Sequence, residues 1–175
     1  LYQTEFKDFK KAEKYYLMAN KSNNKFSLND LAWMYFEENF DKLKALKYAK
    51  KGYKIEKSIY IAHTYATILL WNTEIEEALE VSKDFMENEE AYEKFTNDIR
   101  QFLMLLIAKK QYHSVLKIFN ENPFQLKDRF KPLYYALMNF MQKEYPNEYI
   151  KMGSELKQTV EEIISEINKM AKDYK

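Results

Sequence analysis

Histidines, carboxylates and one serine are the side chains that could do chemistry in this chain, and their spacing argues against a catalytic centre. His63 and His113 lie 50 residues apart, and neither belongs to the His-Glu-x-x-His pattern of a zinc site. The sequence has no cysteine, which excludes thiolate chemistry and cysteine-bound metals. Ser154 follows Gly153 but lacks the flanking residues of a nucleophile elbow. We therefore expect no catalytic residue, no metal and no cofactor.

The adjacent carboxylates do not form an acid–base pair either. Glu76 is followed by Glu77, and Glu161 by Glu162. Neighbouring residues of a helix point about 100° apart, so the two members of each pair do not share a face. We interpret them as solvated charges and predict that the protein is not an enzyme.

Charge is distributed in opposed blocks although the net charge is only +1. Residues 1–57 carry a net charge of +5 and residues 74–98 a net charge of −8. Only Arg100 and Arg129 among the 28 basic residues are arginines, so an RNA-binding repeat is the weakest alternative and no nucleic-acid partner is expected. Four lysines share one helix face, at positions 47, 50, 51 and 54. This face and the acidic block are interpreted as solvated, with partner binding as the alternative.

The composition predicts helices with glycine-free turns. The chain has 2 Gly, 3 Pro and only three valines in 175 residues, too few for phosphate-binding loops or for a sheet protein with many turns. The longest uncharged stretch, residues 58–73, is too short and too polar to span a bilayer, so we expect a buried helix there and no membrane span. No signal-peptide pattern follows Leu1, and a cytoplasmic protein is expected.

Helical segments recur with a period near 33 residues. Ala12, Ala45 and Ala78 stand in matching contexts 33 residues apart, and Val115 follows 37 residues later. An apolar segment precedes each of the last three positions, at residues 31–36, 65–71 and 102–108. Short polar links separate the two members of each pair. This pattern predicts repeated antiparallel helical hairpins in which a small residue lets two helices approach closely.

These residues resemble the tetratricopeptide repeat family, including its Sel1-like subtype, over roughly residues 2–123. The family has a large–small pair in its first helix, an aromatic residue three positions later, and an alanine at the start of its second helix. Leu31-Ala32, Tyr35 and Ala45 match that order. Tyr65-Ala66, Leu69 and Ala78 match the same order in the next repeat.

The resemblance implies an all-α, right-handed α-solenoid of antiparallel helix pairs over residues 1–123, with the first repeat truncated. It also implies a concave groove lined by aromatic and hydrogen-bonding residues, although Trp33 and Trp71 are core residues in the alternative interpretation. The carboxylate clamp of chaperone-binding members is not reproduced, so acidic C-terminal peptides are not expected as ligands. The groove residues implied by the repeat phase are Phe26, Asn29, Trp33, Phe36, Tyr60, His63, Thr67, Trp71, Asn97, Arg100 and Met104.

The C-terminal third is expected to be a capping helix pair over residues 124–175, within the same structural domain. Pro132 suits the first turn of a helix that runs to about residue 143. The last segment carries one apolar stripe, which predicts a helix that covers the end of the solenoid. The alternative is a seam for dimerisation. The stripe contains Met152, Leu156, Val160, Ile163, Ile164, Ile167 and Met170.

Residue types at the expected helix ends predict several caps. Ser27, with Asp30 three residues later, approximates a capping box, and Asp41 is placed to cap the next helix. Thr96 or Asn97 is expected to cap a helix that ends at residue 108. Gly52 is expected to be either a left-handed helix end or a small packing site.

Two functions follow as expectations. The first is a noncatalytic scaffold that binds a peptide or protein segment in the groove, as a monomer or as a weak dimer through the C-terminal helix. The second is a regulatory or sensor segment of a larger enzyme or signalling protein, which packs on a neighbouring domain. It is suggested by the start of the chain inside a repeat, from which we expect a piece of a longer protein.

Overall fold

The structure is a computed structural model that describes residues 9–22, 24, 26–38, 41–143, 149, 151 and 153–173. All regular structure in these ranges is helical and no strand occurs in them, which confirms the all-α prediction. The chain divides into two compact units, residues 1–85 and residues 86–175. No helix in the described ranges is long and apolar enough to cross a membrane.

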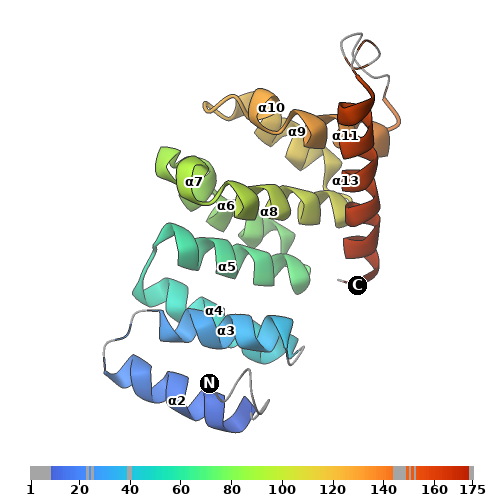
Figure 1. Ribbon diagram of the computed structural model, residues 1–175. Coiled ribbons are helices and arrows are strands. Elements are labelled where there is room, and N and C mark those ends of the chain that lie inside the picture. Colours follow the sequence, from blue (N-terminus) through green and yellow to red (C-terminus); the bar gives the residue numbers. More distant parts are fainter. Residues whose placement is uncertain are drawn as a thin grey trace. The chain divides into compact units, whose positions relative to one another are not determined.

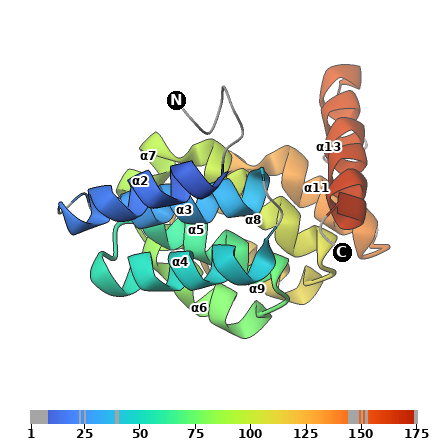
Figure 2. The same cartoon turned by 90° about the horizontal axis from the view of Figure 1, so that it is seen from below.

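The first unit is a series of helices in which sequence neighbours pack on one another (Figure 1). Because short links such as residues 72–74 join them, consecutive helices run antiparallel. Figure 2 shows α3 and α5 along one side of this unit and α4 and α6 along the other. The helices are α2 (Phe9–Lys21), α3 (Ser27–Glu37), α4 (Lys42–Ile55), α5 (Ile59–Trp71) and α6 (Ile75–Met86), whose last residue already belongs to the second unit.

The repeat period seen in the sequence coincides with equivalent places in the helices. Ala12, Ala45 and Ala78 are each the fourth residue of their helix, in α2, α4 and α6. All three side chains are buried, as are Ala32 and Ala66 on the intervening helices. A buried methyl group at the same helical position lets the neighbouring backbones approach, as the 33-residue spacing predicts.

Gly52 proves to be a packing site and not a left-handed helix end. It is buried inside α4, and no glycine of the described residues has a positive φ. A Cβ atom added there would lie 3.5 Å from Leu28 Cβ and 3.9 Å from Ile61 Cγ2, which are ordinary contact distances. The residue therefore brings α4 close to α3 and α5 without requiring a special backbone conformation.

The predicted caps are correct in part. The Asp41 carboxylate accepts a hydrogen bond from the Lys44 N–H at 3.0 Å and caps α4 as expected. Ser27 is the first residue of α3 and not its cap, because its hydroxyl donates to the Asn24 carbonyl at 2.9 Å. Thr96 is likewise the first residue of α8 (Thr96–Ala108), and its hydroxyl bonds the Tyr92 carbonyl.

Left-handed residues that are not glycine follow three of the described helices, and two of these helices are α5 and α8. Thr73 after α5 has φ 65°, and Lys110 after α8 has φ 61°. At the end of α5 the Glu74 N–H donates to the Leu69 carbonyl at 2.9 Å. At the end of α8 the Gln111 N–H donates to the Leu106 carbonyl, also at 2.9 Å. Both helices therefore end in the same backbone hydrogen-bond pattern, with threonine or lysine at the left-handed position where glycine is usual.

The second unit pairs α8 with α9 and places α13 against α8 and α11. Pro132 lies in the first turn of α11, as predicted, although that helix ends at Phe140, three residues before the expected end. Val115 is again the fourth residue of its helix and is buried. The helices of this unit are α7 (Glu89–Lys94), α8, α9 (Tyr112–Glu121), α10 (Leu126–Arg129), α11 (Lys131–Phe140) and α13 (Ser154–Asp173).

Two short helices, α7 and α10, had not been anticipated. The α7 helix begins after Asn88, whose side chain accepts a hydrogen bond from the Glu90 N–H at 3.0 Å. Its six residues lie between α6 and α8, where the spacing of the repeat residues lengthens from 33 to 37. Acidic residues dominate this segment, so it carries too little apolar periodicity to be recognised as a helix from the sequence.

The apolar stripe of the last helix packs within the second unit. Val160, Ile163 and Ile167 of α13 are buried, and α13 contacts α8 and α11. Met152, the first member of the predicted stripe, lies outside the described residues. Part of the stripe is therefore covered within the second unit, while the capping role and the division into repeats and cap at residue 123 stay predictions.

Candidate functional site

Eight of the predicted groove residues lie in the first unit, on matching turns of α3 and α5. The first group consists of Phe26, which immediately precedes α3, and three residues of α3. The second group consists of four residues of α5. The helical spacing of three or four residues places each group along one face. The first group is Phe26, Asn29, Trp33 and Phe36, and the second is Tyr60, His63, Thr67 and Trp71.

The structure brings the two groups together as a row of ring contacts, called here the aromatic row. Phe26 packs edge-on against Tyr60 with ring centroids 6.1 Å apart. The Trp33 and His63 rings follow at 6.4 Å. Phe36 and Trp71 are the last pair, in an edge-on contact at 4.9 Å. The first and last pairs join equivalent positions of the two groups, as the repeat phase implies, whereas Trp33 meets His63, which precedes its counterpart Thr67 by one helical turn.

Exposure changes along the aromatic row. Phe26 and Tyr60 at one end are 45% and 42% exposed, and Trp33 is intermediate. Phe36 and Trp71 at the other end are buried, and so is His63. Lys42 further covers Trp71, with its Nζ 5.3 Å from the ring centroid. The predicted set thus combines a core segment with an exposed aromatic end, and Trp71 belongs to the core.

Two polar side chains in the middle of the row, those of Asn29 and Thr67, have no hydrogen-bond partner among the described residues. Both side-chain atoms of Asn29 and the hydroxyl of Thr67 are buried without a partner among the described residues. Burial raises the pKa of the neighbouring Asp30 carboxyl, and the nearby Asn29 amide opposes that shift without completing a hydrogen bond. Each such group lowers stability by about 1–3 kcal/mol. Native proteins hold few of them, and they often mark functional sites or bound water.

The remaining predicted residues lie in the second unit, on α8. Asn97 is exposed and Met104 is buried. Arg100 Nη2 lies 3.5 Å from Glu166 Oε2 of α13, and both side chains are partly exposed. Arg100 therefore forms an ion pair between α8 and the last helix, a contact that the sequence does not suggest.

The aromatic row offers an aromatic surface for binding. The His63 ring contacts the rings of Phe85 and Trp33, with centroids 5.6 Å and 6.4 Å away. No group of three or more histidine, cysteine, aspartate or glutamate side chains able to hold a metal occurs in the described part of the chain.

Tyrosines and carboxylates form a second set of contacts, which the sequence does not predict. Tyr48 of α4 donates to Glu13 of α2, and Tyr53 of α4 donates to Asp84 of α6 at 2.6 Å. Burial and the Asp84 hydrogen bond raise the pKa of Tyr53 to about 12. These bonds tie together the second helices of successive pairs. Their residues look like ordinary surface residues in the sequence, and only the neighbouring placement of α2, α4 and α6 pairs them.

The charged faces of α4 and α6 also meet. Lys50 Nζ lies 3.4 Å from Glu77 Oε1, and Glu77 also accepts a hydrogen bond from Tyr65 of α5. The Tyr65 hydrogen bond and the Lys50 charge lower the pKa of Glu77. The sequence predicts separate solvated faces for the four lysines at positions 47, 50, 51 and 54 and for the acidic block at residues 74–98. At Lys50 and Glu77 they contact each other, although both side chains remain about half exposed.

Comparison of the chain with models of known protein families, with curated proteins and with solved structures found no match.

Proposed function

We propose that this chain is a noncatalytic helical-repeat scaffold, a right-handed solenoid of the tetratricopeptide type, which binds a peptide or protein segment. One observation carries the proposal. At the exposed end of the aromatic row, Phe26 and Tyr60 pack edge-to-face while each leaves more than 40% of its surface open. Exposed, mutually supported aromatic rings are frequent anchors of protein interfaces.

The two exposed rings support each other. Phe26 and Tyr60 pack edge-on at 6.1 Å between ring centroids, which restricts the rotamers of both side chains. A partner that packs on them therefore meets partly ordered side chains, which lowers the entropy cost of binding. The binding surface is narrower than the eleven-residue groove implied by the family resemblance, since buried members such as Phe36 contribute support instead of contact.

A peptide selection tests the proposal directly. Random peptides are selected on the wild-type chain, and their affinities are measured by fluorescence anisotropy. Phe26→Ala and Tyr60→Ala are each expected to weaken binding about tenfold, as for an interface anchor. Leu43→Ala is the matched control, because Leu43 is 80% exposed but lies on α4. Equal affinities of all variants, with unchanged circular dichroism, would refute the aromatic end as the binding surface.

The alternative, a regulatory segment that packs on a neighbouring domain, is supported by a different observation. Ala12 is the one buried side chain of α2, while Tyr15 and Met18 on that helix are each about half exposed. Such a helix face is suited to a second protein surface. Hydrogen exchange of α2 in the complete gene product, compared with this chain alone, distinguishes the two functions. Protection of α2 supports the alternative, and equal exchange contradicts it.

We further propose a protein or peptide partner in preference to nucleic acid, and a cytoplasmic location. The low arginine content supports the first point. A monomer is favoured over a weak dimer, since the apolar stripe of α13 is already packed on α8 and α11.

A further inference from the structure

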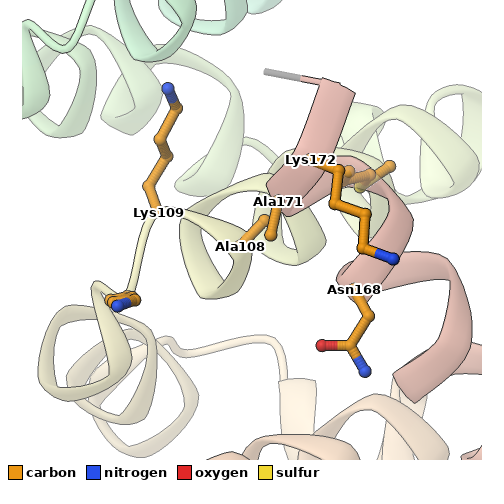
Figure 3. Close-up of a pocket in the computed structure, with 7 residues that line it drawn as sticks. Ala108, Lys109, Asn168, Ala171 and Lys172 are labelled. Atoms are coloured by element: carbon orange, nitrogen blue, oxygen red, sulfur yellow. The ribbon is translucent and has the colours of Figure 1, made fainter. Parts of the chain in front are cut away.

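A pocket of about 640 Å³ lies within the second unit, between the end of α8 and the last turns of α13 (Figure 3). Its volume falls in the range of small-molecule binding sites. In Figure 3, Lys109 lies on the α8 side, and Asn168 and Lys172 extend from α13. The lining residues are Ala108, Lys109, Lys110, Asn168, Met170, Ala171 and Lys172.

The lining combines positive charge with a small apolar surface. Three of the seven lining residues are lysines and none is acidic, so the charged side chains of the lining are all positive. The Asn168 amide adds a further hydrogen-bond donor. Ala108, Met170 and Ala171 supply the apolar part, and the two alanines leave the space open. An anion with a short apolar body matches both features.

The lysines are not needed as hydrogen-bond donors to the carbonyl groups at the C-terminal end of α8. The carbonyls of its last turn already accept backbone hydrogen bonds, for example from the Lys110 N–H to Ile107 at 2.8 Å. Among the described residues, Lys110 and Lys172 form no ion pair with an acidic side chain. Their ammonium groups are therefore available to a ligand at the edge of the pocket.

We propose that this pocket binds a small amphiphilic anion, with its carboxylate, phosphate or sulfonate group near the lysines and its apolar part against Ala108 and Ala171. The proposal is independent of the peptide surface on α3 and α5, because no residue is shared between them. A shape-filling substitution in the pocket should therefore leave peptide binding unchanged.

The fluorescent probe 8-anilinonaphthalene-1-sulfonate, a naphthalene with a sulfonate group, is suited to test the pocket in the folded chain. Its fluorescence is expected to rise on binding, to fall when octyl phosphate competes, and to stay unchanged with the same concentration of neutral octanol. Lys110→Gln and Lys172→Gln are each expected to weaken binding about fivefold, the effect of one unit charge near 4 Å in water. Added salt is expected to weaken it further.

Two further sets of variants separate the pocket from general attraction to a charged surface. Lys143→Gln removes the same charge elsewhere on the second unit, and less than a twofold effect is expected. Ala171→Leu fills the pocket and should abolish probe binding, while Ala108→Leu tests the same space from the other helix. The proposal is overturned if both leucine variants, folded by circular dichroism, bind the probe as the wild type does. Equal effects of all three glutamine variants would also overturn it.

Discussion

Replacing Thr67 with valine is expected to raise the free energy of unfolding of the first unit. Thr67 is 8% exposed on α5, and its hydroxyl has no hydrogen-bond partner in the described part of the chain. Valine has nearly the same shape and nearly the same helix propensity as threonine. The substitution therefore changes one property, since it replaces an unsatisfied hydroxyl with a methyl group.

The expected size follows from the cost of that hydroxyl. A buried polar group without a partner lowers stability by about 1–3 kcal/mol. We expect Thr67→Val to recover about 1.5 kcal/mol of it. For a unit of 85 residues, 1 kcal/mol shifts the melting temperature by about 4–8 °C. The midpoint of thermal unfolding of the first unit should thus rise by about 6–12 °C.

Tryptophan fluorescence during urea unfolding is the appropriate assay. The only two tryptophans, Trp33 and Trp71, both belong to the first unit, so the signal reports that unit alone. Trp71 lies one helical turn from Thr67 on α5. The urea midpoint should rise while the slope stays unchanged, since the surface exposed on unfolding is the same.

Ser82→Ala provides a control of opposite sign. Ser82 is also buried in the first unit, but its hydroxyl donates to the Leu79 carbonyl at 2.8 Å. Removing this bonded hydroxyl should lower stability by about 0.5–1 kcal/mol. If Thr67→Val lowers stability as well, the Thr67 hydroxyl is bonded in the native state and the reasoning is wrong.

Two other predictions concern packing and pH. Gly52→Ala should stabilise the first unit by about 1 kcal/mol in urea unfolding, because the added methyl group meets only ordinary contacts and glycine is a poor helix former. Gly153→Ala, which lies outside any helix, should change stability little. A loss of stability in Gly52→Ala would show that the neighbouring helices cannot accept the methyl group. The lowered pKa of Glu77 gives stability that is present above pH 4.5 and is lost as the pH falls through the folded-state value. Tyr65→Phe removes the hydrogen bond to Glu77, so its urea midpoint should fall less between pH 7 and pH 3 than that of the wild type, and parallel curves would contradict this.

The fold followed from the sequence where spacing alone determines the structure. Ala12, Ala45 and Ala78 recur at the same helical position because close packing of neighbouring helices needs a small residue at a regular interval. The short helix α7 was missed since its polar residues carry no periodic apolar signal. Ser27 was misassigned because a serine can serve as a cap or bond the preceding turn, and only the backbone geometry separates these roles.

The candidate site was predictable as a set of positions but not in its exposure. Repeat phase placed Phe26 opposite Tyr60, and Phe36 opposite Trp71, on facing turns of α3 and α5. Burial depends on how closely two helices approach and on which neighbours cover a ring, as Lys42 covers Trp71. The periodicity of the sequence indicates neither the distance between two helices nor the side chains that cover a ring. The ion pair of Arg100 with Glu166 escaped prediction for a related reason, as it joins residues 66 positions apart in sequence.

The left-handed residues at the ends of α5 and α8 have a consequence for how these turns tolerate sequence change. At Thr73 a glycine would relieve about 1 kcal/mol of backbone strain in the native state. It would also add a nearly equal amount of conformational freedom to the unfolded chain. The two effects almost cancel, so glycine and larger residues are close to interchangeable there. Single substitutions at these helix ends should therefore change stability less than substitutions of the buried alanines.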